Sequence, residues 1–345
     1  MEQSGCRRRL DRRGSDVNHM KTAIQVLDAF ENIRRAQRAG VYAPHKPLLI
    51  LLALARVQRG EPRQVEFAVI DAPLKQLLTE FGPSGAAKSR HYPFWHLATD
   101  GRGMLWDLSG PREILKRNAG ATPSLGELRE HHIKAGFPSD IDDALRHVPG
   151  LIQAVASRTL ETYFPSTIHG DIVATLGLDL DGANDLREDA TAASDYATAE
   201  RRKRDPAFRD RVLRAYEYRC CVCGFDLRIG HTPAGLEAAH IQWHHVGGPD
   251  IESNGLSLCA LHHKLFDLGV FTVEPAQHRV IFSQHAISGG RGMQGELQFH
   301  GRAIQAPQHA SLLPAPQFLA WNAKWVFKAP ARPMVQDTAT PRAAH

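Results

Sequence analysis

Four potential metal ligands form two short pairs in the second half of this 345-residue chain. Two residues separate Cys220 from Cys223, and two separate Cys259 from His262. Zinc prefers sulfur and imidazole nitrogen, and two such pairs fill the four positions of a closed tetrahedral site. The spacing therefore predicts a structural zinc that ties two distant segments together. The alternative is a set of buried cysteines with an unrelated surface histidine.

The cysteines as a whole do not suggest a disulfide framework. The chain has five, an odd number, and three of them fall within four consecutive positions. Secreted domains normally carry an even and dispersed set, so metal binding in a reducing compartment fits better. Cys221 would leave a one-residue spacer before Cys223, and we expect it to be a small buried hydrophobic residue.

Hydropathy and charge narrow the class of protein. The longest apolar stretch, PLLILLALA, is about half the length of a membrane-spanning helix, and no apolar segment follows the basic start as in a secretory signal. We therefore expect a cytoplasmic protein. The net charge of +5 is concentrated in clusters such as RRKRDPAFRDR, which suit a polyanion such as nucleic acid but are weak support alone.

Composition divides the chain into five segments. We expect a basic disordered tail over residues 1–19, a first domain over 20–165, a linker over 166–204, a second domain over 205–328 and a disordered tail over 329–345. The linker is rich in Asp, Ala, Thr and Gly and poor in aromatic residues, a composition typical of connecting segments.

Local patterns predict an α+β protein with a mostly helical first domain. Apolar spacing over 22–40 and 44–60 predicts two helices that end at glycines. Residues 65–82 predict a strand running into a helix, and residues 91–110 predict two short strands around a turn. An Asp-Pro pair at 205–206 predicts the start of the next helix.

A second constellation lies between and beside the two ligand pairs. His240, Asn254 and His263 occur in the segments LEAAHI, SNGLSLC and LHHKLFDLGVF. Over residues 219–273 this pattern resembles the HNH endonuclease family, with its ββα-metal fold. The resemblance implies a metal-dependent DNA endonuclease whose catalytic set is formed by these three residues.

The chemistry of these residue types agrees with that resemblance. His240, at the end of a strand, suits a general base, and Asn254 would brace its loop, although an ordinary turn residue is the alternative. His263 and Asp267 are four apart on the expected helix, so they share a face and could hold one Mg²⁺ or Mn²⁺. His262 would point elsewhere, toward the zinc.

One position departs from the family pattern. Many HNH nucleases carry Asp or His directly before the general base as a metal ligand, and here that residue is Ala239. We therefore expect water to complete the cation's coordination and the metal affinity to be modest.

The first domain carries its own resemblance, in YAPHKPLLILLALARV and HYPFWHL. Over residues 23–165 these segments resemble the sulfur-binding domain of restriction endonucleases that recognise phosphorothioate-modified DNA. The resemblance implies a shallow apolar pocket for sulfur with basic side chains beside it. The pocket would use Tyr92, Pro93 and His96, next to His45 and Lys46, with further phosphate or base-edge contacts from Arg90 and Arg117. A small residue would suit the pocket better than His96.

Together the two resemblances predict a McrA-like type IV restriction endonuclease that binds double-stranded DNA carrying a phosphorothioate and hydrolyses a phosphodiester bond nearby. A homodimer is one way in which both strands would be cut. Two alternatives stay open: an HNH nuclease directed to another modification such as methylcytosine, which would need a pocket for a flipped base, and a non-catalytic zinc-containing DNA-binding protein.

Overall fold

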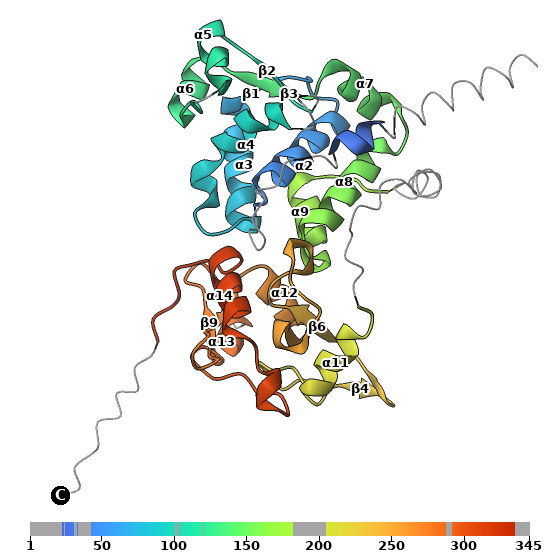
Figure 1. Cartoon of the computed structure of the whole chain (residues 1–345), viewed down its shortest axis with the longest axis vertical. Helices are drawn as coiled ribbons and strands as arrows, with labels where there is room; N and C mark the ends of the chain where they lie inside the picture. The colour runs from blue at the N-terminus through green and yellow to red at the C-terminus, as the bar shows by residue number, and fades with distance from the viewer. Residues whose placement is uncertain are drawn as a thin grey trace, which may run out of the picture. The chain divides into compact units, whose positions relative to one another are not determined.

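The computed structural model describes residues 43–181 except 101–102, 104 and 120, together with 205–287, 292–334 and most of 23–33. The chain divides into two compact units between Arg202 and Lys203, and each unit is described by itself (Figure 1). The tail expected over 1–19 and most of the linker expected over 166–204 lie outside the described residues.

Helix α2, His45–Gln58, is the centre of the first unit. Prolines 44 and 47 lie at its beginning, where a missing N–H costs little, and Gly60 follows its end with a φ of +72°. Residues 48–55 are all buried, as expected for a helix covered on every side. The helices that pack on it include α3 (Phe67–Phe81), α7 (Ser139–His147), α8 (Leu151–Tyr163) and α9 (His169–Leu176).

A small antiparallel sheet completes the first unit. Its strands are β1 (Val65–Glu66), β3 (Lys134–Gly136) and β2 (Asp107–Ser109), in that order. The short helices α4 (His91–His96), α5 (Arg112–Leu115) and α6 (Leu125–Glu130) connect these elements. The predicted run from a strand into a helix over residues 65–82 is confirmed by β1 and α3.

The prediction of two strands over residues 91–110 is wrong in its first half. Residues 91–96 form α4, and only β2 is a strand. Pro93 lies in the first turn of α4, where proline is tolerated. The neighbouring Phe94 and Trp95 are both fully buried, which a helical turn allows more readily than the alternating faces of a strand.

The folded part of the first unit also extends beyond the boundary expected at residue 165. Residues 166–168 form a 3₁₀ turn and α9 follows, with Ile168, Ile172 and Leu176 buried. These three residues recur at a spacing of four, so they line one face of the segment. The change in composition that suggested a linker hides this apolar pattern.

The second unit is centred on a hairpin followed by a helix. Strands β6 (Leu236–His240) and β7 (Gly255–Cys259) pair antiparallel, with His240 opposite Gly255, and α12 (Ala260–Asp267) follows directly. This is the expected ββα arrangement. Helix α11 (Phe208–Ala215) packs on the hairpin at Gly255, where a side chain would collide with Val212. It begins later than predicted, because Asp205 caps a turn by accepting a hydrogen bond from Ala207 N.

Short hairpins and helices surround this centre: β4 (Arg228–Ile229) with β5 (Thr232–Pro233), β8 (Phe271–Val273) with β9 (Val280–Phe282), α13 (Gly292–Leu297) and α14 (Pro316–Trp325). Part of the expected C-terminal tail is bound to this unit, since Arg332 N donates to Phe282 O at 2.8 Å. Residues 335–345 lie outside the described part of the chain. None of the described helices is long and apolar enough to cross a membrane.

Candidate functional site

The two predicted ligand pairs meet in the second unit. Cys220, Cys223, Cys259 and His262 bring one donor atom each to within 4.8 Å of one another. The Cys223 and Cys259 sulfurs are 4.0 Å apart, and His262 Nδ1 lies 3.6 Å from Cys220 Sγ. Tetrahedral zinc with Zn–S distances of about 2.3 Å needs ligand atoms roughly 3.8 Å apart. Three thiols and one imidazole at these distances fit a structural zinc.

Cys221 is not part of this cluster. Its thiol is buried, and burial together with the nearby Cys220 raises the pKa of Cys221 well above its usual value. A neutral thiol is a poor metal ligand. The residue packs in the core of the second unit, as a small hydrophobic side chain would.

A carboxylate stands behind the histidine of the cluster. His262 Nε2 lies 2.9 Å from Glu296 Oε2 on α13, and both atoms are buried, although the angles between them fall short of hydrogen-bond geometry. Metal-binding histidines usually present the second nitrogen to such a partner, which fixes the tautomer and the ring. Glu296 is thus the carboxylate next to Nε2, on the side of the ring away from the cysteine sulfurs that Nδ1 faces.

His263, the next residue of α12, faces a different group of side chains. Its Nδ1 lies 2.5 Å from Glu237 Oε2 on β6, and its Nε2 lies 3.2 Å from Asp267 Oδ2. Burial disfavours the charged imidazole, but Asp267 and Glu237 outweigh burial and raise the pKa of His263 to about 9. The two carboxylates contact opposite ring nitrogens, so one of them can share a cation with the imidazole, and a carboxylate with an imidazole suits Mg²⁺ or Mn²⁺.

His240 ends β6 and is held in a defined orientation. Its Nε2 lies 2.7 Å from Asp250 Oδ1, and its ring stacks on Phe208 with centroids 4.1 Å apart. Burial raises the pKa of Asp250, but hydrogen bonds from the Asp205 N–H and His240 outweigh burial and hold it below its usual value. The ionised carboxylate can only accept, so Nε2–H donates and the lone pair lies on Nδ1.

Asn254 fastens the loop between His240 and Asp250. The buried amide donates to Gln242 O at 3.0 Å and to Pro249 O at 2.9 Å, and its oxygen accepts from Gln242 N at 2.8 Å. All three bonds go to the backbone of one loop. They fix the direction in which the chain leaves β6, and therefore the position of His240.

Sequence reasoning missed Glu237, Asp250 and Glu296. Glu237 lies inside the segment LEAAHI, and the available signal was a charged residue within a strand that is otherwise apolar up to His240. Asp250 and Glu296 lie in or after loops of irregular length, and no fixed spacing links them to their histidines. Only the fold brings them together.

In the first unit, Tyr92, Pro93 and His96 lie together on α4. Tyr92 is 48% exposed, whereas Pro93 is buried. The rings of Tyr92 and His96 stack with centroids 5.8 Å apart, and His96 Nε2 lies 2.7 Å from Thr122 Oγ1. Burial and the charge of Lys46 lower the pKa of His96, so a neutral ring borders the exposed tyrosine.

The two basic residues of α2 have different surroundings. Lys46 Nζ lies 2.7 Å from the fully buried Asp100, which fixes the ammonium group. His45 Nε2 lies 3.2 Å from Ala86 O, and burial lowers the pKa of His45. Lys46 therefore carries the positive charge here, while neutral His45 holds the segment that precedes α4.

Arg90 and Arg117 are both engaged within the domain. Arg90 donates to both oxygens of Asp71 and to Ala87 O, and its side chain is only 11% exposed. Arg117 pairs with Glu127 at 2.5 Å and stays half exposed. Of these two predicted DNA contacts, Arg117 is the one that a phosphate can reach without opening a buried ion pair.

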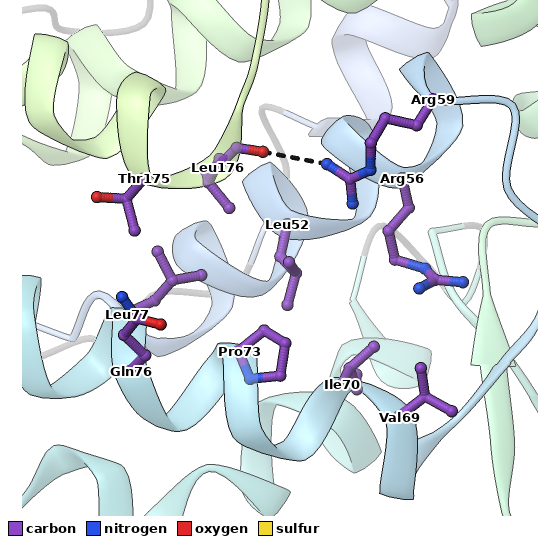
Figure 2. Close-up of a pocket in the computed structure, with 10 residues that line it drawn as sticks. All are labelled: Leu52, Arg56, Arg59, Val69, Ile70, Pro73, Gln76, Leu77, Thr175 and Leu176. Atoms are coloured by element: carbon purple, nitrogen blue, oxygen red, sulfur yellow. Dashed lines mark hydrogen bonds between the residues drawn. The ribbon is translucent and has the colours of Figure 1, made fainter.

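A separate small pocket of about 200 Å³ lies between α2, α3 and α9 (Figure 2). Its polar groups include Arg56 and Arg59, and both of these pair with Glu61. Arg59 also donates to Leu176 O at 3.1 Å, which closes one side. The pocket contains none of the residues expected to contact DNA.

Comparison with known families assigns both units. Residues 23–181 match the family described as the ScoMcrA-like DNA sulfur-binding domain, and residues 220–274 match the HNH endonuclease family. The first match ends at residue 181, which is also the last described residue after α9. No curated protein sequence matches the chain.

Solved structures similar to the chain include two domain structures and one whole enzyme. The sulfur-binding domain of ScoMcrA with phosphorothioated DNA is 24% identical with a TM-score of 0.39, covering 44% of this chain and 94% of that one. The sulfur-binding domain of SprMcrA with phosphorothioated DNA is 24% identical with a TM-score of 0.34, covering 44% of this chain and 90% of that one. The type IV phosphorothioation-dependent restriction endonuclease ScoMcrA is 23% identical with a TM-score of 0.36, and the match covers 42% of this chain. It covers 28% of that enzyme, so the chain spans less than a third of its length.

The HNH match covers the ββα arrangement of β6, β7 and α12, and the sulfur-binding match covers α4 with its exposed Tyr92. This protein carries a ScoMcrA-like DNA sulfur-binding domain followed by an HNH endonuclease domain.

Proposed function

We propose that this protein binds DNA carrying a phosphorothioate and hydrolyses a phosphodiester bond nearby, as a modification-dependent restriction endonuclease. One observation carries the proposal: a single chain joins a DNA sulfur-binding domain to an HNH endonuclease domain. A sulfur-binding domain without a nuclease would only bind modified DNA. A nuclease without a sulfur-binding domain would not distinguish modified from unmodified DNA. Joined, they direct hydrolysis to modified DNA.

The exposed Tyr92 ring is the proposed contact for sulfur. Phosphorothioate keeps its negative charge but exposes a larger and less strongly hydrated atom than oxygen, so an apolar ring accepts it at a smaller desolvation cost. Lys46, fixed by Asp100, supplies positive charge near the same phosphate. His96 and Thr122 close one side of the ring, where a smaller residue would leave a deeper pocket.

In the nuclease domain, His240 acts as the general base. Because Asp250 accepts from Nε2, Nδ1 takes the proton of a water molecule. The resulting hydroxide oxygen bonds to phosphorus, and the bond from phosphorus to one ester oxygen breaks, so that this oxygen leaves with the electron pair and takes a proton from water. His263 with one of its carboxylates would hold a divalent cation, which would supply positive charge for the phosphate oxygens. Asn254 keeps the base in place by fastening its loop.

The partners and location follow from the same chemistry. We propose Zn²⁺ in the cysteine cluster and Mg²⁺ or Mn²⁺ at His263, with Mn²⁺ favoured because one ligand is imidazole. Cysteines that bind zinc must stay reduced, which suits the cytoplasm. We further propose that two copies act as a homodimer, so that each cuts one strand of the duplex.

Matched duplexes that differ by one sulfur atom test this function. The wild-type protein should bind and cut the modified duplex preferentially in the presence of Mn²⁺. Tyr92→Ala should lose the preference for sulfur and keep weak, salt-sensitive binding, because phosphate contacts do not depend on the ring. His240→Ala should bind as the wild type does and cut at least about 100-fold more slowly. Equal wild-type affinity for both duplexes would refute phosphorothioate recognition, and undiminished cutting by His240→Ala would refute the base.

A further inference from the structure

His263 presents its two ring nitrogens to two different carboxylates. Nδ1 lies 2.5 Å from Glu237, and Nε2 lies 3.2 Å from Asp267. A histidine that binds a metal through one nitrogen donates the N–H of the other to an acceptor. One carboxylate can therefore share a cation with His263, while the other orients the ring.

The surroundings of the two carboxylates separate these roles. The Asp267 side chain is 1% exposed, and its Oδ1 accepts a hydrogen bond from Trp243 Nε1 at 2.9 Å. The Glu237 side chain is 46% exposed. Magnesium and manganese keep several waters and meet the substrate phosphate, so their site needs an open side. Glu237 lies on that open side, and Asp267 lies on the closed one.

Strand geometry explains why the carboxylate comes from position 237. Glu237 and Ala239 are two residues apart in β6 and therefore share a face of the strand. Ala239 is fully buried and offers no ligand atom. The longer side chain of Glu237 reaches α12 from two residues earlier in the strand, and its contact with His263 connects the hairpin to the helix.

We propose that Glu237 and Nδ1 of His263 are the protein ligands of the catalytic cation, and that Asp267 positions His263 by accepting its Nε2–H. The inference rests on the proposed nuclease function and specifies its metal site. It replaces the ligand pair His263 and Asp267, which helical spacing alone suggests, with a pair drawn from β6 and α12.

Binding of Mn²⁺ tests the assignment without any cleavage. The full-length protein with His240→Ala, bound to duplex DNA, is titrated with Mn²⁺, and the electron paramagnetic resonance signal of free Mn²⁺ is followed. Asp267→Asn should weaken binding by about 10- to 100-fold, as expected for an outer partner of a ligand. Glu237→Gln should weaken it more. Glu217→Gln, at an exposed carboxylate in the same domain, is the matched control and should bind as its parent does.

A change of ligand distinguishes a metal contact from a structural one. Glu237→His should recover Mn²⁺ binding but lose Mg²⁺ binding, because a second imidazole favours the softer cation. Unchanged Mn²⁺ affinity in Glu237→Gln, with zinc content and circular dichroism intact, would overturn the assignment without contradicting the proposed nuclease function. A larger loss of Mn²⁺ affinity in Asp267→Asn than in Glu237→Gln would have the same meaning. If the parent protein binds no Mn²⁺ at all, the metal-dependent nuclease fails together with this inference.

Discussion

Two adjacent histidines on one helix face opposite kinds of site. His262 meets three cysteine sulfurs on Nδ1 and Glu296 behind Nε2, and its side chain is 2% exposed. His263 meets Glu237 and Asp267, and one of these two carboxylates is nearly half exposed. The first site is closed and complete in protein ligands. The second has one side open to solvent, at Glu237.

Under the proposed function, this difference would let one short helix serve a structural and a catalytic metal site at once. Neighbouring side chains on a helix diverge by about 100°, so a buried site and an open site can share a backbone segment. The cysteine cluster joins the segment of Cys220 and Cys223 to the start of α12. The helix then holds His263 against β6. Substitutions at the closed site should therefore destabilise the second domain, and substitutions at the open site should lower the rate of DNA cleavage.

Loss of a zinc ligand gives the largest expected effect. Cys223→Ser should release zinc and unfold the second domain, because metal binding in small zinc sites contributes on the order of 10 kcal/mol to folding. Metal analysis and thermal unfolding of the full-length protein measure this. Cys221→Ala, two positions away but outside the cluster, should keep its zinc. A Cys223→Ser protein that stays folded and free of zinc would remove the structural role of the closed site.

At the proposed general base, Asp250→Asn should slow cutting by about 100-fold and leave zinc content and DNA binding unchanged. Without the carboxylate the imidazolium of His240 forms less readily, so the acid limb of the pH–rate profile should move to lower pH. His244, whose Nε2 lies 3.8 Å from Asp250 Oδ2, is the other histidine that this charge faces.

The pH–rate profile of Asp250→Asn separates positioning of the base from general damage. Asp210→Asn, on the exposed side of α11, is the matched control and should follow the wild-type profile. A slower Asp250→Asn enzyme with an unshifted acid limb would mean that Asp250 supports the loop without acting on His240.

The smallest effect is expected behind the zinc cluster. Glu296→Gln should weaken zinc binding by about 10-fold and keep the fold, because an outer partner only orients the ligand. Transfer of zinc to a competing chelator measures the change against Glu217→Gln. Equal zinc retention in the two variants would show that His262 is oriented by the surrounding packing alone.

Much of both domains is predictable from local pattern. The zinc ligands repeat at a fixed spacing, α2 begins at prolines and ends at a glycine, and the ββα order follows from LEAAHI, SNGLSLC and the helix after them. Helix α4 was not predictable in this way, because YPFW has aromatic residues typical of strands and only the packing of Phe94 and Trp95 selects a helix. The end of the first domain was missed because three apolar residues on one face of residues 166–176 are diluted by polar neighbours.

The sequence by itself determined which residues could carry chemistry: the four zinc ligands, and His240, Asn254 and His263. The types of these residues and their spacing along the chain do not depend on the fold. Only the tertiary structure decided which acids serve them, because Glu237, Asp250 and Glu296 reach their histidines across 26, 10 and 34 residues of chain. A carboxylate partner is selected by distance and burial rather than by spacing, since many surface acids are chemically equal until the fold brings one of them within 3 Å of a ring nitrogen.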